Sequence, residues 1–158
     1  MKLIDLIFAC KEIQFETMGS LDVEIFGITS NTKKIAEGHL FVALRGAKVD
    51  GHDFITEAIE KGAVAILGQS GSKFQLSLDN SFSSCFIACK DPRGTYPKLC
   101  SVYYNKQPEM IAGITGTNGK SSVAEFTRQL WSFNSLSAAS LGTLGLVTEN
   151  FSKKTNLT

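Results

Sequence analysis

The part of the sequence best suited to chemistry is a glycine-rich segment followed by a lysine and two serines. It lies between an apolar run, residues 110–115, and a segment whose apolar residues recur at helical spacing. Glycines permit a sharp turn that directs several backbone N–H groups at one anion, and a helix start adds partial positive charge. The pattern therefore predicts a phosphate cradle. Its residues are Gly116, Thr117, Asn118, Gly119, Lys120, Ser121 and Ser122.

Two side chains of this segment have specific predicted roles. Lys120 is expected to neutralise the β- and γ-phosphates of ATP, and the Ser121 hydroxyl to ligate Mg²⁺, a cation that prefers oxygen ligands. The common phosphate-loop pattern has a glycine five residues before Gly119, where this chain has Ile114. Only the shorter Gly-x-x-Gly-Lys-Ser pattern is present. The alternative interpretation is a glycine-rich turn with a solvated lysine.

The first hundred residues predict an α/β domain that holds such a site. Apolar residues at helical spacing open the chain, and residues 23–29, 40–44, 63–67 and 84–89 have the composition of strands. A helix is expected from Phe54 to a glycine cap at Gly62, so that the strands on either side pair in parallel. A further helix is expected from about Thr95, with Pro97 in its first turn.

The remaining residues predict the beginning of a second α/β domain. Residues 105–108 break the helical pattern, which gives domains at 1–108 and 109–158. A buried strand is expected at 110–115, followed by a helix and then by a strand with a glycine-rich turn at 136–146. The helix is expected to have on one side Val123, Phe126, Leu130 and Trp131. A phosphate-loop sheet needs several strands, so we expect an unfinished domain that exposes Ile111, Ile114 and Trp131.

Composition excludes several classes of function. A net charge of +1 provides no basic field for nucleic acid, and no apolar run is long enough to span a bilayer. None of the four cysteines forms a CxxC pair; Cys85 and Cys89 are expected on one strand face as buried thiols, with a disulfide or metal site as alternatives. These features predict a cytoplasmic protein with neither nucleic-acid binding nor membrane insertion. We also expect a monomer.

The phosphate-cradle motif and the segments before it resemble the Mur ligase family. The motif is similar to that family's shortened loop, usually Gly-Thr-Asn-Gly-Lys-Thr. Residues 28–33, 38–46 and 50–63 resemble, in the right order, its Asp-Ser-Arg segment, its Gly-Asp-Leu-Phe-Val-Ala-Leu-x-Gly strand and its next helix. Residues 141–145 and 156–158 resemble the members that add the third amino acid more than those that perform the fourth step.

This resemblance implies an ATP-dependent ligase whose first domain binds the UDP end of UDP-MurNAc-L-Ala-D-Glu and whose second binds ATP and Mg²⁺. It implies an acyl-phosphate intermediate and an incoming amino acid, with meso-diaminopimelate the commoner choice. Lys120 is the implied catalytic residue, and the chain alone is expected to be inactive. The implied substrate-binding residues are Ile28, Ser30, Gly46, Ala47, Lys48, Val49 and Thr158.

Some positions depart from the family pattern, and other functions remain open. Thr29 and Asn31 replace an Asp and an Arg, and His39 replaces an Asp, so any ion pair there is in doubt. His39 and His52 are expected to be surface or capping residues, and Ser30 alone could be a turn-forming hydroxyl. The alternatives are a fourth-step ligase, a small phosphate-loop kinase and a non-catalytic nucleotide-sugar binding module.

Overall fold

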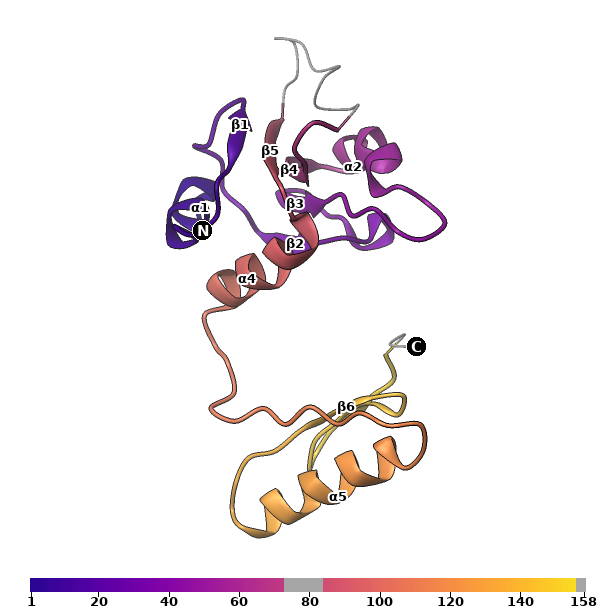
Figure 1. Ribbon diagram of the computed structural model, residues 1–158. Helices are drawn as coiled ribbons and strands as arrows, with labels where there is room; N and C mark the ends of the chain where they lie inside the picture. Colours follow the sequence, from indigo (N-terminus) through magenta and orange to yellow (C-terminus); the bar gives the residue numbers. More distant parts are fainter. Residues whose placement is uncertain (73–83, 156–158) are drawn as a thin grey trace. The chain divides into compact units, whose positions relative to one another are not determined.

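The computed structural model describes residues 1–72 and 84–155. They form two compact units, Met1–Gln107 and Pro108–Thr158, each described below by itself (Figure 1).

A five-stranded sheet forms the centre of the first unit. Its strands are β1 (Glu16–Met18), β2 (Gly27–Thr29), β3 (His39–Val42), β4 (Ala63–Gln69) and β5 (Cys85–Cys89). The spatial order is β1-β5-β4-β3-β2, with β1 antiparallel to β5 and the other neighbours parallel. The predicted α/β class and the parallel pairing of β3 with β4 are confirmed.

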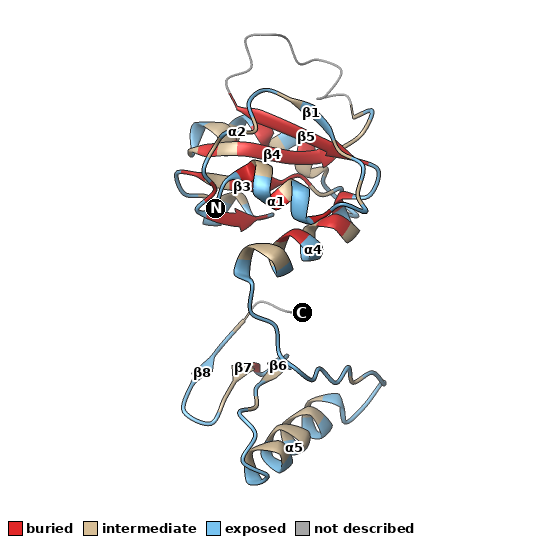
Figure 2. Cartoon of the chain, turned by 90° about the vertical axis from the view of Figure 1, so that its left-hand side faces the viewer, coloured by how far each residue is buried: buried red, intermediate tan, exposed pale blue. Residues whose placement is uncertain are grey.

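Helices cover both faces of this sheet. Helices α1 (Leu3–Ala9) and α4 (Pro92–Tyr104) bury Leu3, Leu6 and Leu99 against one face. A 3₁₀ helix, η2 (Gly51–Phe54), leads into α2 (Ile55–Glu60), which covers the other face; a second one, η1 (Thr32–Lys34), follows β2. Because β3, β4 and β5 are covered on both sides, almost all of their residues are buried, as the colours of Figure 2 show.

Two predicted boundaries in this unit are wrong. The strand expected at 23–29 is β2 only from Gly27, because the backbone before it pairs with the chain start, where Leu3 N donates to Val23 O. The last helix begins at Pro92, not near Thr95, so Pro97 lies inside it. The Asp91 side chain accepts a hydrogen bond from Gly94 N, and this N-cap, with proline in the first turn, outweighs the interruption.

The cysteines are structural. Cys85 and Cys89 lie on one face of β5 in the buried core, as predicted, and all four cysteines are free thiols. Burial raises the pKa of Cys85 to about 11, so its thiol stays protonated near neutral pH. Within residues 1–72 and 84–155, no group of His, Cys, Asp or Glu is arranged to hold a metal ion.

The second unit contains one helix and a small antiparallel sheet. Helix α5 (Lys120–Phe133) precedes β6 (Ser140–Gly142), β7 (Gly145–Val147) and β8 (Ser152–Lys153), ordered β6-β7-β8. The buried strand predicted at 110–115 is absent, and Ile111 is 77% exposed. A strand needs a neighbour for its backbone groups, and in the described part of this unit none lies beside that segment.

Candidate functional site

The predicted phosphate cradle is a glycine-dependent turn that opens α5. Gly116 has φ of 145° and Gly119 has φ of 75°, both in the region that favours glycine. Gly119 is the N-cap of α5, and its carbonyl accepts the bond from Val123 N at 2.9 Å. An added Cβ at Gly119 would meet nothing within 4 Å, so the backbone angle, and not crowding, requires glycine there.

Anion-binding groups converge at this turn. Helix α5 has 14 residues, and no side chain caps its N-terminus, so the N–H groups of its first turn have no side-chain acceptor. Lys120 is exposed, and its Nζ lies 2.5 Å from Gly116 O and 3.3 Å from Thr117 O. A cation and free amides at a helix start together suit a polyphosphate.

The hydroxyl groups of the cradle fit Mg²⁺ better than a softer metal. Ser121 is half-buried, and its Oγ lies 2.9 Å from Thr143 Oγ1 in the turn between β6 and β7. Asn118 and Ser122 are exposed. Mg²⁺ takes oxygen ligands and keeps several waters and phosphate oxygens, so one or two hydroxyls are an adequate protein contribution.

The predicted substrate-binding segments of the first unit emerge at one edge of its sheet. Because β2 and β3 are parallel, Ser30 and the loop at residues 46–49 both follow the carboxyl ends of adjacent strands. Ile28 is buried within β2, whereas Ser30 and all four loop residues are exposed. Thr158 lies outside the described residues. Ligands of parallel α/β sheets bind at this edge, so the arrangement is suitable for a substrate.

The segment after β2 is shaped by its own polar side chains. Thr29 Oγ1 accepts a hydrogen bond from Asn31 N at 3.1 Å, and Asn31 Oδ1 accepts one from Lys33 N at 2.9 Å. Ser30 lies between them, and burial raises the pKa of Tyr96 on α4, a rise that the side chain and backbone of Ser30 partly offset. Thr29 and Asn31 therefore shape this turn through side-chain to backbone hydrogen bonds, and the Ser30 side chain influences Tyr96 on α4.

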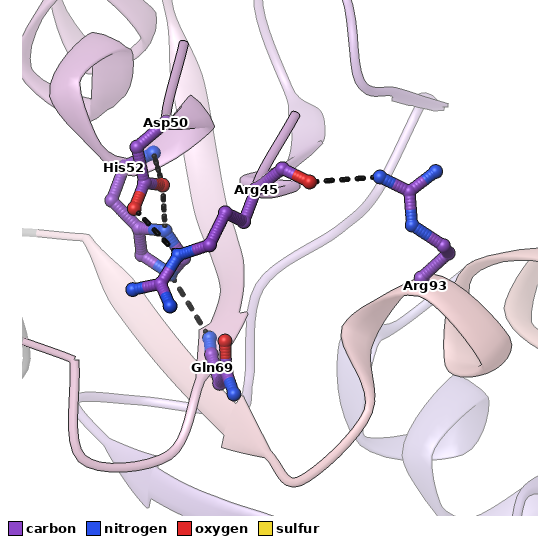
Figure 3. A network of polar contacts seen from close by, with 5 residues as sticks. All are labelled: Arg45, Asp50, His52, Gln69 and Arg93. Atoms are coloured by element: carbon purple, nitrogen blue, oxygen red, sulfur yellow. Dashed lines mark hydrogen bonds and ion pairs between the residues drawn. The ribbon is translucent and has the colours of Figure 1, made fainter. Parts of the chain in front are cut away.

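A polar network holds the base of the loop at residues 46–49 (Figure 3). Gly46 N donates a hydrogen bond to Val49 O within the loop. Arg45 and Asp50 flank the loop in the sequence, and Arg45 Nε donates to Asp50 Oδ2 at 3.1 Å. The other carboxylate oxygen of Asp50 accepts from the backbone N and Nδ1 of His52, at 3.0 and 2.6 Å.

His52 connects this loop to the end of β4. Its Nε2 accepts a hydrogen bond from Gln69 N at 3.0 Å, so the proton of a neutral ring must be on Nδ1, facing Asp50. His52 is buried, and both of its ring nitrogens make hydrogen bonds inside the first unit. The expectation of a surface or capping residue is therefore wrong. His39 is half-buried, and its Nδ1 accepts from Ala36 N at 3.3 Å, which is a turn-capping contact.

These contacts surround a small polar pocket. It has a volume of about 200 Å³ at the carboxyl ends of β3, β4 and β5, and Arg45, Lys90 and Arg93 are among its lining residues. Arg93 donates to Arg45 O at 2.8 Å, which connects the start of α4 to the same loop. The His52 backbone N–H is the main cause that lowers the pKa of Asp50 to about 2.

Comparison with known proteins decides the family. The model of the Mur ligase family, catalytic domain, matches residues 24–117, more than half of the chain. The chain belongs to the Mur ligase family. No helix among the described residues is long and apolar enough to cross a membrane.

Several relatives of this Mur ligase chain share the name UDP-N-acetylmuramoyl-L-alanyl-D-glutamate–2,6-diaminopimelate ligase. The Rhizobium meliloti protein is 40% identical over 79% of this chain and 24% of its own length. The Caulobacter vibrioides protein is 42% identical over 80% of this chain and 25% of its own length. The chain therefore spans about a quarter of the length of these relatives.

A solved Mur ligase structure has the same fold. The MurF ligase of Thermotoga maritima, crystallised in complex with ADP, matches with a TM-score of 0.51 and 29% identity, over 73% of this chain and 25% of that one. The likeness supports the Mur ligase fold over most of the chain.

Sequence reasoning missed the network that supports the candidate loop of this Mur ligase chain. Asp50, His52 and Arg93 were not predicted as site residues, and the bond from Gln69 N to His52 joins residues 17 apart in the chain. The available signal was Asp50-Gly51-His52, because an Asp whose side chain caps the residue two positions on is a common turn device.

Proposed function

We propose that this chain provides the substrate-nucleotide and phosphate-binding parts of an ATP-dependent ligase that adds meso-diaminopimelate to UDP-MurNAc-L-Ala-D-Glu. The observation that carries the proposal is the cradle at the start of α5, where Gly119 turns the backbone and Lys120 begins a helix with an uncapped N-terminus. The shared name of these relatives supports the third-step reaction over the fourth.

The proposal assigns the binding of the UDP-linked substrate and the binding of ATP to different domains. Residues 1–108 bind the UDP end of the substrate through Ile28, Ser30 and the loop at residues 46–49, where Lys48 offsets phosphate charge. Residues 109–158 begin the ATP-binding domain. Thr158 contacts the substrate. The enzyme acts in the cytoplasm as a monomer.

The cradle residues bind and orient ATP for phosphoryl transfer. The γ-phosphoryl group passes to the terminal carboxylate of the substrate and gives an acyl phosphate, from which the amine of the amino acid displaces phosphate. Lys120 holds the β- and γ-phosphates and stabilises their developing charge, while the backbone N–H groups at the start of α5 donate hydrogen bonds to the remaining phosphate oxygens. Ser121 would hold Mg²⁺, which supplies further charge neutralisation.

A chimaeric enzyme tests the proposal. This chain replaces the matching quarter of the Rhizobium meliloti ligase, and phosphate release is measured with UDP-MurNAc-L-Ala-D-Glu, Mg-ATP and diaminopimelate. The expected result is ligation that Lys120→Ala lowers by about 10²- to 10³-fold, the scale for removing a transition-state charge partner. Lys106→Ala, a lysine outside the cradle, is the control and retains the activity. A Lys120→Ala chimaera with near-normal turnover would overturn the role of the cradle.

A further inference from the structure

The hairpin formed by β6 and β7 is joined to α5 at two points. Thr143 Oγ1 lies 2.9 Å from Ser121 Oγ, across 22 residues of sequence. One helical turn further on, Ser140 Oγ donates to Glu125 Oε2 at 3.2 Å. Residues four apart on a helix share a face, so both contacts hold the hairpin against the same side of α5.

The second contact is made to a carboxylate that is itself fixed. Glu125 accepts hydrogen bonds from Arg128 and Gln129 on its own helix, and the Arg128 contact is the main cause that lowers its pKa to about 2. Glu125 is therefore an ionised acceptor at neutral pH. The contact of Ser140 with Glu125 holds the hairpin against α5. Thr143 therefore stays close to Ser121 even without the hydrogen bond between them.

A serine that ligates a cation needs an acceptor for its proton. The hydroxyl has one O–H and two lone pairs, and the cation takes a lone pair. Serine is not β-branched, so its side chain can adopt all three staggered rotamers, and a neighbouring acceptor selects among them. Thr143 Oγ1 is at hydrogen-bonding distance from Ser121 Oγ and can accept that proton.

We propose that Thr143 is a positioning residue for Mg²⁺: its hydroxyl oxygen accepts a hydrogen bond from the Ser121 O–H, which leaves the Ser121 lone pairs for the cation. The inference rests on the proposed function, because it needs a nucleotide at the cradle. Groups that orient a metal ligand typically change metal affinity by about 10- to 100-fold when removed.

The test measures ADP binding to the 158-residue chain by ¹⁵N NMR titration at millimolar nucleotide, once with EDTA and once with Mg²⁺. The ratio of the two affinities is the Mg²⁺ enhancement. Thr143→Val removes the hydroxyl and keeps the shape, and is expected to lower the enhancement about tenfold while the affinity in EDTA stays unchanged. Thr143→Ser restores the hydroxyl and the enhancement.

Two controls separate positioning from a general structural effect. Thr148→Val makes the same change in the turn after β7, where Thr148 Oγ1 donates to Phe151 O, and leaves the enhancement unchanged. In a Ser121→Ala background, Thr143→Val has no further effect, because the two changes remove one coupled pair.

The outcomes distinguish this inference from the function on which it rests. If the unaltered chain binds no ADP in either condition, the cradle assignment and the inference both fail. If it binds ADP with a Mg²⁺ enhancement that Thr143→Val leaves intact, the cradle stands and the role of Thr143 is wrong. Loss of ADP affinity in EDTA on Thr143→Val would also overturn it, since the residue would then support the loop and not the cation.

Discussion

The two units of the chain differ in how they hold their candidate sites. In the first, a sheet buried on both faces supports loops whose bases are fixed by side chains from three different elements. In the second, Gly145 is the single buried residue among those described, and Phe126 and Leu130 on α5 are 63% and 60% exposed. The geometry of the cradle therefore comes from local features, whereas that of the substrate loop comes from packing.

This contrast predicts which substitutions should alter the structure of each candidate site. The Gly46–Val49 loop depends on residues distant in sequence, so a change in the core or in the His52 network should alter it. The cradle depends on two glycine conformations and the start of one helix, so changes elsewhere in its unit should leave its backbone intact.

The largest expected effect is on stability, and it comes from comparing a leucine-to-alanine substitution in each unit. Leu67→Ala removes a fully buried side chain from β4 and is expected to lower the free energy of unfolding by about 2–5 kcal/mol. Leu130→Ala removes an exposed side chain from α5 and should change it by less than about 0.5 kcal/mol. Urea unfolding followed by circular dichroism measures both. Equal losses would show that the two units do not differ in packing as described.

The second prediction concerns the buried histidine. His52→Phe leaves the Gln69 N–H and the Asp50 carboxylate without their ring partners, and is expected to cost about 1–3 kcal/mol of unfolding free energy. His39→Phe is the matched control and should cost about 0.5 kcal/mol or less, because His39 makes one 3.3 Å contact near the surface. Thermal unfolding of both variants checks this. A His52→Phe protein as stable as the His39→Phe protein would contradict the supporting role.

Much of the fold could be predicted because its signals are local. The apolar run at residues 40–44 and the glycine at Gly62, which has φ of 97°, mark β3 and the end of α2. The cradle also follows from its own residues. The start of α4 was predicted too late because Pro97 was placed in the first turn, whereas the helix begins at Pro92 after the Asp91 cap.

The rest depends on contacts that no local pattern encodes. The strand expected at residues 110–115 has the right composition, but strand formation needs a neighbouring strand, which the sequence does not specify. The His52 network joins the end of β3 to the ends of β4 and β5. The contact between Ser121 and Thr143 likewise depends on how the hairpin folds back on α5.

The third prediction separates two roles of Ser30. Ser30→Ala removes one hydroxyl from the candidate substrate edge, and is expected to weaken binding of UDP-MurNAc-L-Ala-D-Glu by about 2- to 10-fold, the value of one net hydrogen bond. Tyr96→Phe removes the phenol hydroxyl whose pKa Ser30 influences, but leaves the Ser30 hydroxyl available. Calorimetric titration of UDP-MurNAc-L-Ala-D-Glu into each variant measures the two affinities. If Tyr96→Phe weakens binding as much as Ser30→Ala does, Ser30 acts by fixing α4 and not by contacting the substrate.

The smallest expected effect is a pH dependence that also distinguishes the units. The pKa of Asp50 is lowered from 3.8 to about 2 in the folded chain, so its contribution to stability is present above pH 4 and is lost as the pH falls toward 2. The pKa of Glu125 is also about 2, but Arg128 and Gln129 on the same helix supply its main contacts. Protonating Asp50 weakens contacts among several elements, whereas protonating Glu125 weakens chiefly contacts within α5 and one to β6.

Unfolding free energies measured between pH 5 and pH 2 test this difference. Asp50→Asn should flatten the acid-induced loss of stability, because the variant has no carboxylate to protonate, and should lower the stability near neutral pH. Glu125→Gln should leave the slope of the global transition unchanged and alter only the helical signal of α5. A global slope that responds to Glu125→Gln as strongly as to Asp50→Asn would mean that α5 unfolds cooperatively with the first unit, and the contrast between a packed and a locally held site would no longer stand.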